Sequence, residues 1–235
     1  MSTKRAVILA GGKGTRLRPY TVVLPKPLMP IGEYPILEVV VRQLVKAGFN
    51  HITMAVNHQA GLIRAFFGDG DKWNVKIDYS QENEPLGTMG PLNLISDLPD
   101  QFLIMNGDIL TDLDFGVFYD THVVNNAIFS IASYQRLQTV DYGVLEITTS
   151  GRLVAFAEKP SNAYMVSMGI YMASKRVLQF IPKSIYGFDN LMLELISRNE
   201  SVHVNRHCGY WLDIGRPDDY MQAIEEFEGL KASLL

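Results

Sequence analysis

Short, uninterrupted apolar runs are the clearest pattern in the first half of the chain. Residues 6–10 are apolar at every position, and runs of similar length occupy 52–56 and 102–105. A strand of a parallel sheet that is buried on both faces has this pattern, and these runs are too short for a stable helix. We therefore predict three buried strands.

A helix is predicted between the first two of these strands. Ile36, Val40 and Leu44 recur at every fourth position, which places them on one face of a helix. Pro35 suits the start of this helix, and Gly48 suits the left-handed turn that ends one. Strand, helix and strand together predict a βαβ unit, the building block of a parallel sheet.

After residue 108, strands separated by turns replace strands separated by helices. The strands predicted in this half span 128–134, 143–147, 153–158 and 168–172. Residues 148–151 suit a hairpin turn. Ser174 is placed to cap a short helix at 175–181, and Pro217 is placed to open a last helix. The fold class predicted is α/β, a single domain over residues 1–235 with an open, mixed, mainly parallel sheet flanked by helices.

Composition changes this picture little but excludes several classes of protein. Of the 235 residues, 47% are hydrophobic and 20% charged, which excludes a disordered or collagen-like chain. The formal net charge is -4 without a basic block, which argues against nucleic-acid or membrane binding. No apolar stretch has the length of a secretory signal or a membrane span. We expect a soluble, cytoplasmic protein whose single cysteine, Cys208, is buried and forms no disulfide.

The strongest chemical signal is the glycine-rich turn after the first predicted strand. Gly11, Gly12 and Gly14 let backbone N–H groups approach an anion closely, and Arg16 adds positive charge beside them. Ligands of open α/β sheets bind at the carboxyl ends of the strands, where this turn lies. A plain strand-to-loop turn would also use glycines, but the nearby cation favours a phosphate site. The spacing matches neither the dinucleotide fingerprint nor the P-loop.

A second cation follows this turn. Pro25 and Pro27 keep the backbone around Lys26 extended and so aim its ammonium. The glycine turn at 11–19 followed by Pro25-Lys26-Pro27 resembles the signature of the sugar-1-phosphate nucleotidylyltransferases, the pyrophosphorylases that make nucleotide sugars. The resemblance covers most of the chain. It implies a Rossmann-like nucleotidyltransferase fold with a nucleotide-binding half at about 1–125 and a sugar-binding half at about 126–235.

The resemblance also implies which residues bind the nucleotide. These are Leu9, Ala10, Gly11, Gly12, Gly14, Thr15, Gln81, Gly87 and Thr88. Gln81 and the backbone of Gly87 are expected to contact the base, and Thr88 to start a helix. Where the family usually has small residues, this chain has Met89 and Pro91, which could reshape the floor under the base or ribose.

The sugar phosphate is expected in the second half of the chain. The residues implied for it are Gly143, Glu158, Lys159, Ser167 and Gly169. Many members have asparagine where this chain has Ser167, and a serine reaches less far and offers one hydroxyl in place of an amide. Without the resemblance, Glu158 and Lys159 would be interpreted as a surface ion pair.

Asp108 and Asp213 are the predicted metal ligands. Asp108 follows a predicted buried strand, and Asp213 lies between Trp211 and Gly215. Carboxylates at such positions are the hard oxygen ligands that magnesium takes alongside substrate phosphates. Either aspartate alone would more often be a turn or capping residue. The resemblance implies the same pair and Mg²⁺ as cofactor. None of the five histidines has the spacing of a metal site.

The resemblance implies transfer of a nucleoside monophosphate from a nucleoside triphosphate to a sugar 1-phosphate, with release of pyrophosphate. The catalytic residues implied are Arg16, Lys26, Asp108 and Lys159. The stretch 11–21 together with 25–28 most resembles guanylyltransferases for mannose 1-phosphate or manno-heptose 1-phosphate, enzymes of nucleotide-sugar and polysaccharide biosynthesis. GTP is therefore favoured, and a homo-oligomer is compatible with this class.

Three alternatives stay open at this point. One is a thymidylyl- or uridylyltransferase acting on a hexose 1-phosphate, and another is a non-catalytic nucleotide-sugar sensor. A retaining glycosyltransferase would use an Asp-x-Asp metal motif, which Asp112 and Asp114 match. Their position at an expected loop-to-helix boundary makes helix capping the better interpretation.

Overall fold

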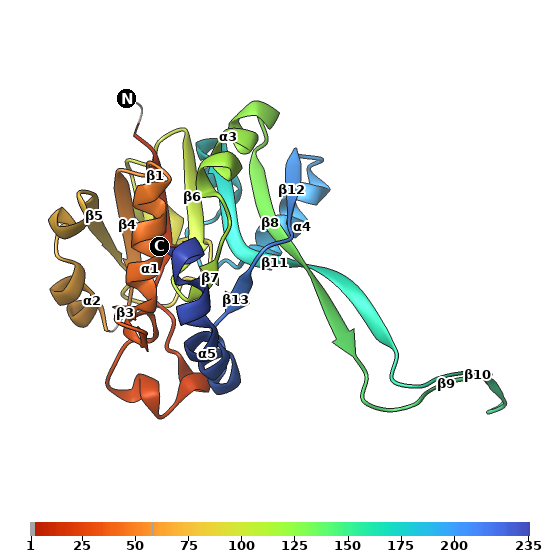
Figure 1. Cartoon of the computed structure of the whole chain (residues 1–235). Helices are drawn as coiled ribbons and strands as arrows, with labels where there is room; N and C mark the ends of the chain where they lie inside the picture. The colour runs from red at the N-terminus through yellow and green to blue at the C-terminus, as the bar shows by residue number, and fades with distance from the viewer. Residues whose placement is uncertain (1–2, 58) are drawn as a thin grey trace.

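A seven-stranded sheet organises the chain (Figure 1). The computed structural model describes residues 3–57 and 59–235, so His58 lies outside it. The strands in spatial order are β12 (Val202–His207), β8 (Phe129–Thr139), β11 (Ser161–Ser174), β6 (Gln101–Asn106), β1 (Arg5–Leu9), β4 (His51–Val56) and β5 (Lys76–Gln81). Only β11 runs antiparallel to its neighbours in this sheet. The predicted fold class, a mixed, mainly parallel α/β sheet in a single domain, is confirmed.

Both faces of the sheet are covered, which explains the uninterrupted apolar runs. Ala6 and Ile8 of β1 pack on the face that carries α1 (Ile36–Lys46) and α3 (Phe115–Asn125). Val7 points to the opposite face, among side chains of α4 (Phe188–Ser197) and of the 3-10 helices Gly90–Leu94 and Lys175–Phe180. On the outer side of α1, helix α5 (Pro217–Leu234) closes a third apolar cluster.

The predicted strands at 6–10, 52–56 and 102–105 are confirmed as β1, β4 and β6. The predicted helix is α1, which starts directly after Pro35 and ends before Gly48, whose φ is 85°. Two short helices differ from expectation: no helix starts at Thr88, and the segment after Ser174 is a 3-10 helix. Cys208 is exposed rather than buried.

Several elements were not predicted from the sequence and appear only in the structure. These are α2 (Ala60–Phe67), β5, α3, α4, β12 and the short strands β2 (Pro30–Ile31), β3 (Tyr34–Pro35), β7 (Ile109–Thr111) and β13 (Trp211–Asp213). Within the described residues, no helix combines the length and apolar character needed to cross a bilayer.

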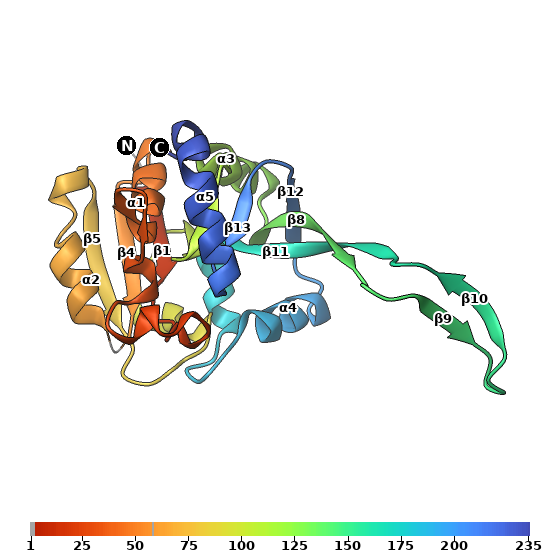
Figure 2. The same cartoon turned by 60° about the horizontal axis from the view of Figure 1, so that its bottom comes forward.

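An arm formed by residues 135–165 projects from this body (Figures 1 and 2). It begins where β8 and β11 continue past the sheet as a two-stranded ribbon, paired from Tyr134↔Val166 to Thr139↔Ser161. Its outer end is the hairpin of β9 (Val144–Ile147) and β10 (Leu153–Ala157). The four predicted strands of the second half are therefore present, but the outer two form the arm instead of joining the sheet.

Candidate active site

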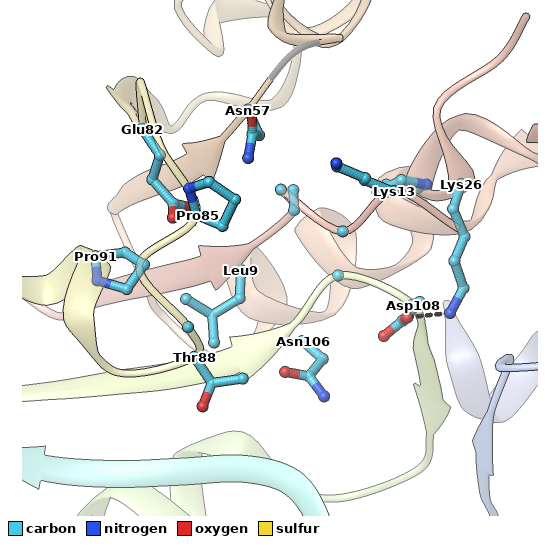
Figure 3. A pocket seen from close by; sticks show the side chains of 16 residues that line it. Leu9, Lys13, Lys26, Asn57, Glu82, Pro85, Thr88, Pro91, Asn106 and Asp108 are labelled. Atoms are coloured by element: carbon cyan, nitrogen blue, oxygen red, sulfur yellow. Dashed lines mark hydrogen bonds and ion pairs between the residues drawn. The ribbon is translucent and has the colours of Figure 1, made fainter. Parts of the chain in front are cut away.

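A cavity of about 390 Å³ lies at the carboxyl ends of β1 and β6 (Figure 3). This is where ligands of open α/β sheets bind. It is lined by Leu9, Ala10, Gly11, Gly12, Lys13, Lys26, Pro27, Asn57, Glu82, Pro85, Gly87, Thr88, Pro91, Asn106, Gly107 and Asp108. Many predicted nucleotide-binding residues thus line one cavity, together with the predicted catalytic pair Lys26 and Asp108.

The glycine turn forms one wall of the cavity, and two of its glycines, Gly11 and Gly14, have steric reasons to be glycine. A Cβ on Gly11 would lie 3.0 Å from Glu82 Oε1. Gly14 has a φ of 58°, and a Cβ there would lie 2.9 Å from the Thr21 side chain, whose hydroxyl donates to the Gly14 carbonyl over 2.7 Å. Gly14 and Thr15 lie behind the lining of the cavity, because the chain turns there into the 3-10 helix Thr15–Leu17.

Glu82, not Gln81, points into the cavity (Figure 3). Gln81 is exposed at the end of β5, where its Oε1 accepts a hydrogen bond from Arg64. The Glu82 side chain is buried, and its Oε2 accepts from the Leu86 amide over 3.1 Å. Burial raises the pKa of Glu82 above its ordinary value, against the effect of that amide. Sequence reasoning missed Glu82, although strand alternation puts neighbouring residues on opposite sides.

Gly87 and Thr88 line the cavity as predicted, but in a loop. Gly87 has a φ of 80°, and a Cβ would lie 2.6 Å from the Tyr186 carbonyl oxygen, so no other residue fits there. The Thr88 hydroxyl accepts from the Phe188 amide over 2.8 Å. Met89 is fully buried in the core, whereas Pro91 reaches the cavity. Of the two departures from the family pattern, only Pro91 shapes the floor.

Asp108 and Asp213 are brought together by the β7–β13 ladder. Asp213 pairs with Ile109 in this ladder, and the Ile214 amide donates to the Asp108 carbonyl over 3.1 Å. The Asp108 carboxylate forms an ion pair with the buried Lys26 ammonium through Oδ2, and its buried Oδ1 has no hydrogen-bond partner. Burial, and then the nearby Asp108 charge, raise the pKa of Asp213. The two carboxylates are thus close enough to repel each other, and the nearby Lys26 and Arg16 charges only partly offset the effects that raise the pKa of Asp213.

This donor set fits a magnesium ion that is completed by substrate. Both ligands are carboxylate oxygens, the chemistry that magnesium prefers, and the buried Asp108 Oδ1 has no hydrogen-bond partner of its own. Among the described residues, no group of three or more His, Cys, Asp or Glu side chains could hold a metal ion without help. The remaining ligands would therefore be phosphate oxygens and water.

A second cavity of about 290 Å³ is lined by Asp213. Arg16, Arg136 and Arg216 line it together with Asp213 and Asp219. The Asp219 carboxylate accepts from the amides of Gly215 and Arg216, so it is already engaged. Arg16 thus faces this cavity rather than the first one. Arg136 and Arg216 are cations that sequence reasoning missed, because nothing near them in the chain points to a phosphate.

Gly169 packs against Asn106, which lines the first cavity, and Ser167 is hydrogen-bonded to Gly169. Gly169 has a φ of 74°, and a Cβ there would lie 2.6 Å from the Asn106 amide nitrogen. A break in the β8–β11 register between Ser167 and Tyr171 produces this close approach. The Ser167 hydroxyl donates to the Tyr171 hydroxyl over 3.0 Å and accepts from the Gly169 amide.

Gly143, Glu158 and Lys159 lie on the arm and do not line either cavity. They are close to one another: a Cβ on Gly143 would lie 2.6 Å from the Phe156 ring and 3.2 Å from Glu158 Oε2. Lys159 has a φ of 45°, a conformation that a lysine rarely adopts. The structure therefore separates the predicted sugar-phosphate residues into a pair beside the cavity and a cluster on the arm.

Comparison with known proteins now identifies the family. A family model described as nucleotidyl transferase matches residues 5–229. The chain belongs to the nucleotidyl transferase family. The resemblance inferred from the glycine turn and Lys26 is confirmed at this level, and the cavity described above is the one at which this nucleotidyl transferase gathers its motif residues.

Curated relatives of this nucleotidyl transferase have sugar-nucleotide names. Mannose-1-phosphate guanylyltransferase catalytic subunit beta of Danio rerio is 32% identical over 225 residues, which cover 92% of this chain and 62% of that protein. UTP–glucose-1-phosphate uridylyltransferase of Synechocystis sp. is 33% identical over 242 residues, 94% of this chain and 62% of that protein. The chain therefore spans about 62% of the length of these relatives.

Two solved structures resemble this nucleotidyl transferase along nearly its whole length. HddC from Yersinia pseudotuberculosis matches with a TM-score of 0.75 and 28% identity over 96% of this chain and 100% of that one, and it was also solved complexed with GMP-PN. A putative glucose-1-phosphate thymidylyltransferase from Bacillus anthracis matches with a TM-score of 0.76 over 95% of this chain and 94% of that one. At 22% identity, the second match shows the fold alone.

Proposed function

We propose that this protein transfers a nucleoside monophosphate from a nucleoside triphosphate to a sugar 1-phosphate and releases pyrophosphate. The observation that carries the proposal is the group formed by Lys26, Asp108 and Asp213 beside the glycine turn. It combines a fixed cation with carboxylates that suit a divalent ion, at the edge of a sheet where nucleotides bind. The names of the relatives support the same reaction class.

The reaction needs no protein nucleophile. An oxygen of the sugar phosphate attacks the α-phosphorus in line, and the bond between that phosphorus and the departing pyrophosphate oxygen breaks. Backbone amides of Gly11 and Gly12 would hold the triphosphate, and Lys26 would stabilise charge on the α-phosphate. Arg16, which faces the neighbouring cavity but is near enough to Asp213 to affect its pKa, would stabilise the leaving group from that side. Asp108 and Asp213 would hold magnesium, which would neutralise phosphate charge. The protein's own contribution is alignment and fixed positive charge.

Glu82 favours GTP among the nucleotides. Guanine presents two adjacent donors, N1–H and N2–H, which one carboxylate can accept together. Uracil and thymine present a single N–H between two carbonyl oxygens, and these oxygens would be repelled by a carboxylate. Glu82 is buried in the cavity wall. A base edge without paired donors would leave its carboxylate without hydrogen bonds to offset the cost of removing it from water. Mannose or manno-heptose 1-phosphate is the sugar substrate we propose, in line with the guanylyltransferase names among the relatives.

The division into halves follows the same lines. We propose that the cavity residues up to Asp108 bind the nucleotide and that Ser167, Gly169 and Asp213 belong to the half that binds the sugar. We propose a cytoplasmic enzyme of nucleotide-sugar biosynthesis that acts on small substrates and on neither nucleic acid nor membranes.

Pyrophosphate release tests the proposal. The four common ribonucleoside triphosphates and dTTP are each combined with mannose, manno-heptose and glucose 1-phosphates, with magnesium and with a chelator. We expect release that needs both substrates and the metal, and that is greatest with GTP. Release that occurs with UTP or dTTP, but not with GTP, would instead support the uridylyl- or thymidylyltransferase alternative. If no combination releases pyrophosphate but calorimetry still detects nucleotide binding, the result would support a non-catalytic sensor.

The glycosyltransferase alternative finds no support in the geometry of 112–114. Asp114 caps α3, because its Oδ1 accepts from the Val117 amide over 2.9 Å. Asp112 Oδ1 accepts from the Tyr210 amide over 2.7 Å and contacts His207. Both carboxylates therefore already serve structural hydrogen bonds.

A further inference from the structure

Three arginines line the second cavity without an ionic partner. They are Arg16, Arg136 and Arg216, and the cavity has a volume of about 290 Å³. Within residues 3–57 and 59–235, which the structure describes, none of the three guanidinium groups forms a hydrogen bond or an ion pair. A guanidinium group keeps its charge in a protein. Positive charges gathered around one cavity repel one another unless an anion lies between them.

The three arginines belong to separate segments of the chain. Arg16 lies in the 3-10 helix that follows the glycine turn, Arg136 on β8 at the base of the arm, and Arg216 directly before α5. Figure 1 shows β13 lying between β8 and α5, and residues of β13 also line the cavity. The fold therefore gathers cations that are far apart in the sequence.

The carboxylates of this cavity do not neutralise the arginines. Asp219 Oδ2 accepts from the amides of Gly215 and Arg216 over 3.1 and 2.7 Å, which fixes it at the start of α5. Asp213 is a proposed metal ligand, so its charge is assigned to that ion. The cavity thus has positive charge for an anion that the chain itself does not supply.

A phosphate group is the anion that suits this cavity. A guanidinium group offers paired N–H donors in the geometry that binds two phosphate oxygens at once. A carboxylate presents its two oxygens in one plane, whereas a phosphate presents oxygens in several directions. Guanidinium groups that approach from separate segments can therefore bind one phosphate group together.

The second cavity is separate from the nucleotide cavity but adjoins it. Among the described residues, no side chain lines both cavities. They meet at Asp108 and Asp213, which the β7–β13 ladder holds together. An anion in the second cavity therefore leaves room for a nucleotide in the first, and it lies beside the place where the α-phosphate is expected to react.

We propose that Arg136 and Arg216 complete, with Arg16, a second phosphate site that is filled while a nucleotide occupies the first cavity. Its ligand is a phosphate-bearing partner of the reaction other than the nucleotide, either the released pyrophosphate or the sugar phosphate. Pyrophosphate has the charge to engage several guanidinium groups, and the Tyr134 and Trp211 rings, with centroids 5.3 Å apart, form an apolar wall that suits a sugar. Both ligands present the same phosphate chemistry. The phosphate site itself does not depend on the proposed function, whereas the choice between the two partners rests on it.

Calorimetry tests the site without turnover. Inorganic pyrophosphate and mannose 1-phosphate are each titrated into the protein in the presence of magnesium, with and without saturating GMP. We expect at least one of the two probes to bind without competition from GMP. Arg136→Gln and Arg216→Gln should each weaken that binding by about 10–100-fold, because each variant loses a charge-assisted hydrogen bond.

The matched control is Arg206→Gln. Arg206 is exposed on the neighbouring strand β12 and lines neither cavity, so its variant should bind the probe as the wild-type protein does. Far-ultraviolet circular dichroism checks that all three variants are folded. The proposal is overturned if neither probe binds, if GMP displaces the probe, or if both cavity variants bind it as tightly as the control does.

Steady-state kinetics identifies which partner carries the phosphate. If the site holds pyrophosphate, the variants Arg136→Gln and Arg216→Gln raise KM for pyrophosphate in the reverse reaction and leave KM for the sugar phosphate unchanged. If it holds the sugar phosphate, the two effects are exchanged. A rise in KM for GTP alone would assign both arginines to the nucleotide and overturn the separate site. If the wild-type protein shows no turnover, the proposed function fails, and calorimetry still decides whether the phosphate site exists.

Discussion

The Lys26 ammonium is paired with the Asp108 carboxylate, which joins the proline-flanked loop to the end of the central strand β6. This pair leaves one oxygen of Asp108 buried and without a partner. A cation and a free carboxylate oxygen therefore stand side by side at the cavity, as a metal-assisted phosphate transfer requires.

Asp108→Asn should lower turnover by at least about 100-fold, because an amide is a poor magnesium ligand and removes the charge opposite Lys26. Steady-state pyrophosphate release across a magnesium titration measures the effect. The control is Asp114→Asn, since asparagine keeps the cap of α3 and the residue lies outside both cavities. Near-normal turnover of a folded Asp108→Asn enzyme would refute the metal assignment.

Glu82→Gln should weaken the selection for guanine. Losing a charge-assisted hydrogen bond costs about 1.5–3 kcal/mol, so kcat/KM with GTP should fall by about 10–100-fold relative to that with UTP. Competition between the two nucleotides measures the ratio directly. Gln81→Ala is the matched control, because Gln81 points away from the cavity and its loss should leave the ratio unchanged. A ratio that falls in Gln81→Ala and stays unchanged in Glu82→Gln would show that Gln81, not Glu82, contacts the base.

Gly169→Ala should destabilise the fold by about 1–3 kcal/mol, because φ is 74° and the new Cβ would lie 2.6 Å from the Asn106 amide. The displaced Asn106 should also raise KM for the sugar phosphate. Urea unfolding and initial rates check the two effects. Gly229→Ala in α5, where a Cβ meets nothing within 4 Å, should instead be stabilising by about 0.5–1 kcal/mol. Equal effects of the two substitutions would contradict the steric argument.

Stability should fall as the pH drops from 7 to 5. His122 is buried between Ser130 and Gln101, and burial, followed by the nearby His203, lowers its pKa to about 4. The folded state therefore binds fewer protons than the unfolded state between pH 6.5 and 4, so stability present above this range is lost on acidification. The expected loss is about 2 kcal/mol by urea unfolding. His122→Gln should reduce this loss, and an unchanged pH profile of that variant would assign the effect to other groups.

Local sequence was enough to predict the strands whose side chains are buried on both faces and are therefore almost all apolar. The strands β1, β4 and β6 are buried on both faces, so residues 6–10 and 102–105 are apolar throughout and only Thr53 interrupts the run at 52–56. The glycine turn, Lys26 and Asp108 follow in a short stretch or directly after such a strand, and they meet at the cavity because carboxyl ends of parallel strands share one edge. Helix α3 was not predicted because Val117, Val123 and Val124 are exposed and blur its apolar stripe.

Contacts between distant segments decided the rest. Asp213 meets Asp108 through the β7–β13 ladder, about which the residues near either aspartate say nothing. Glu82 replaces Gln81 in the cavity because the path of the chain after β5 turns one of two neighbours inward. Sequence patterns predicted the strands β9 and β10 to within one residue, with Gly143 and Glu158 just outside them, but a strand pattern is the same whether its partner belongs to a sheet or to a projecting arm. Burial depends on what packs against a segment, so only the tertiary structure could separate these residues from the cavity of their own chain.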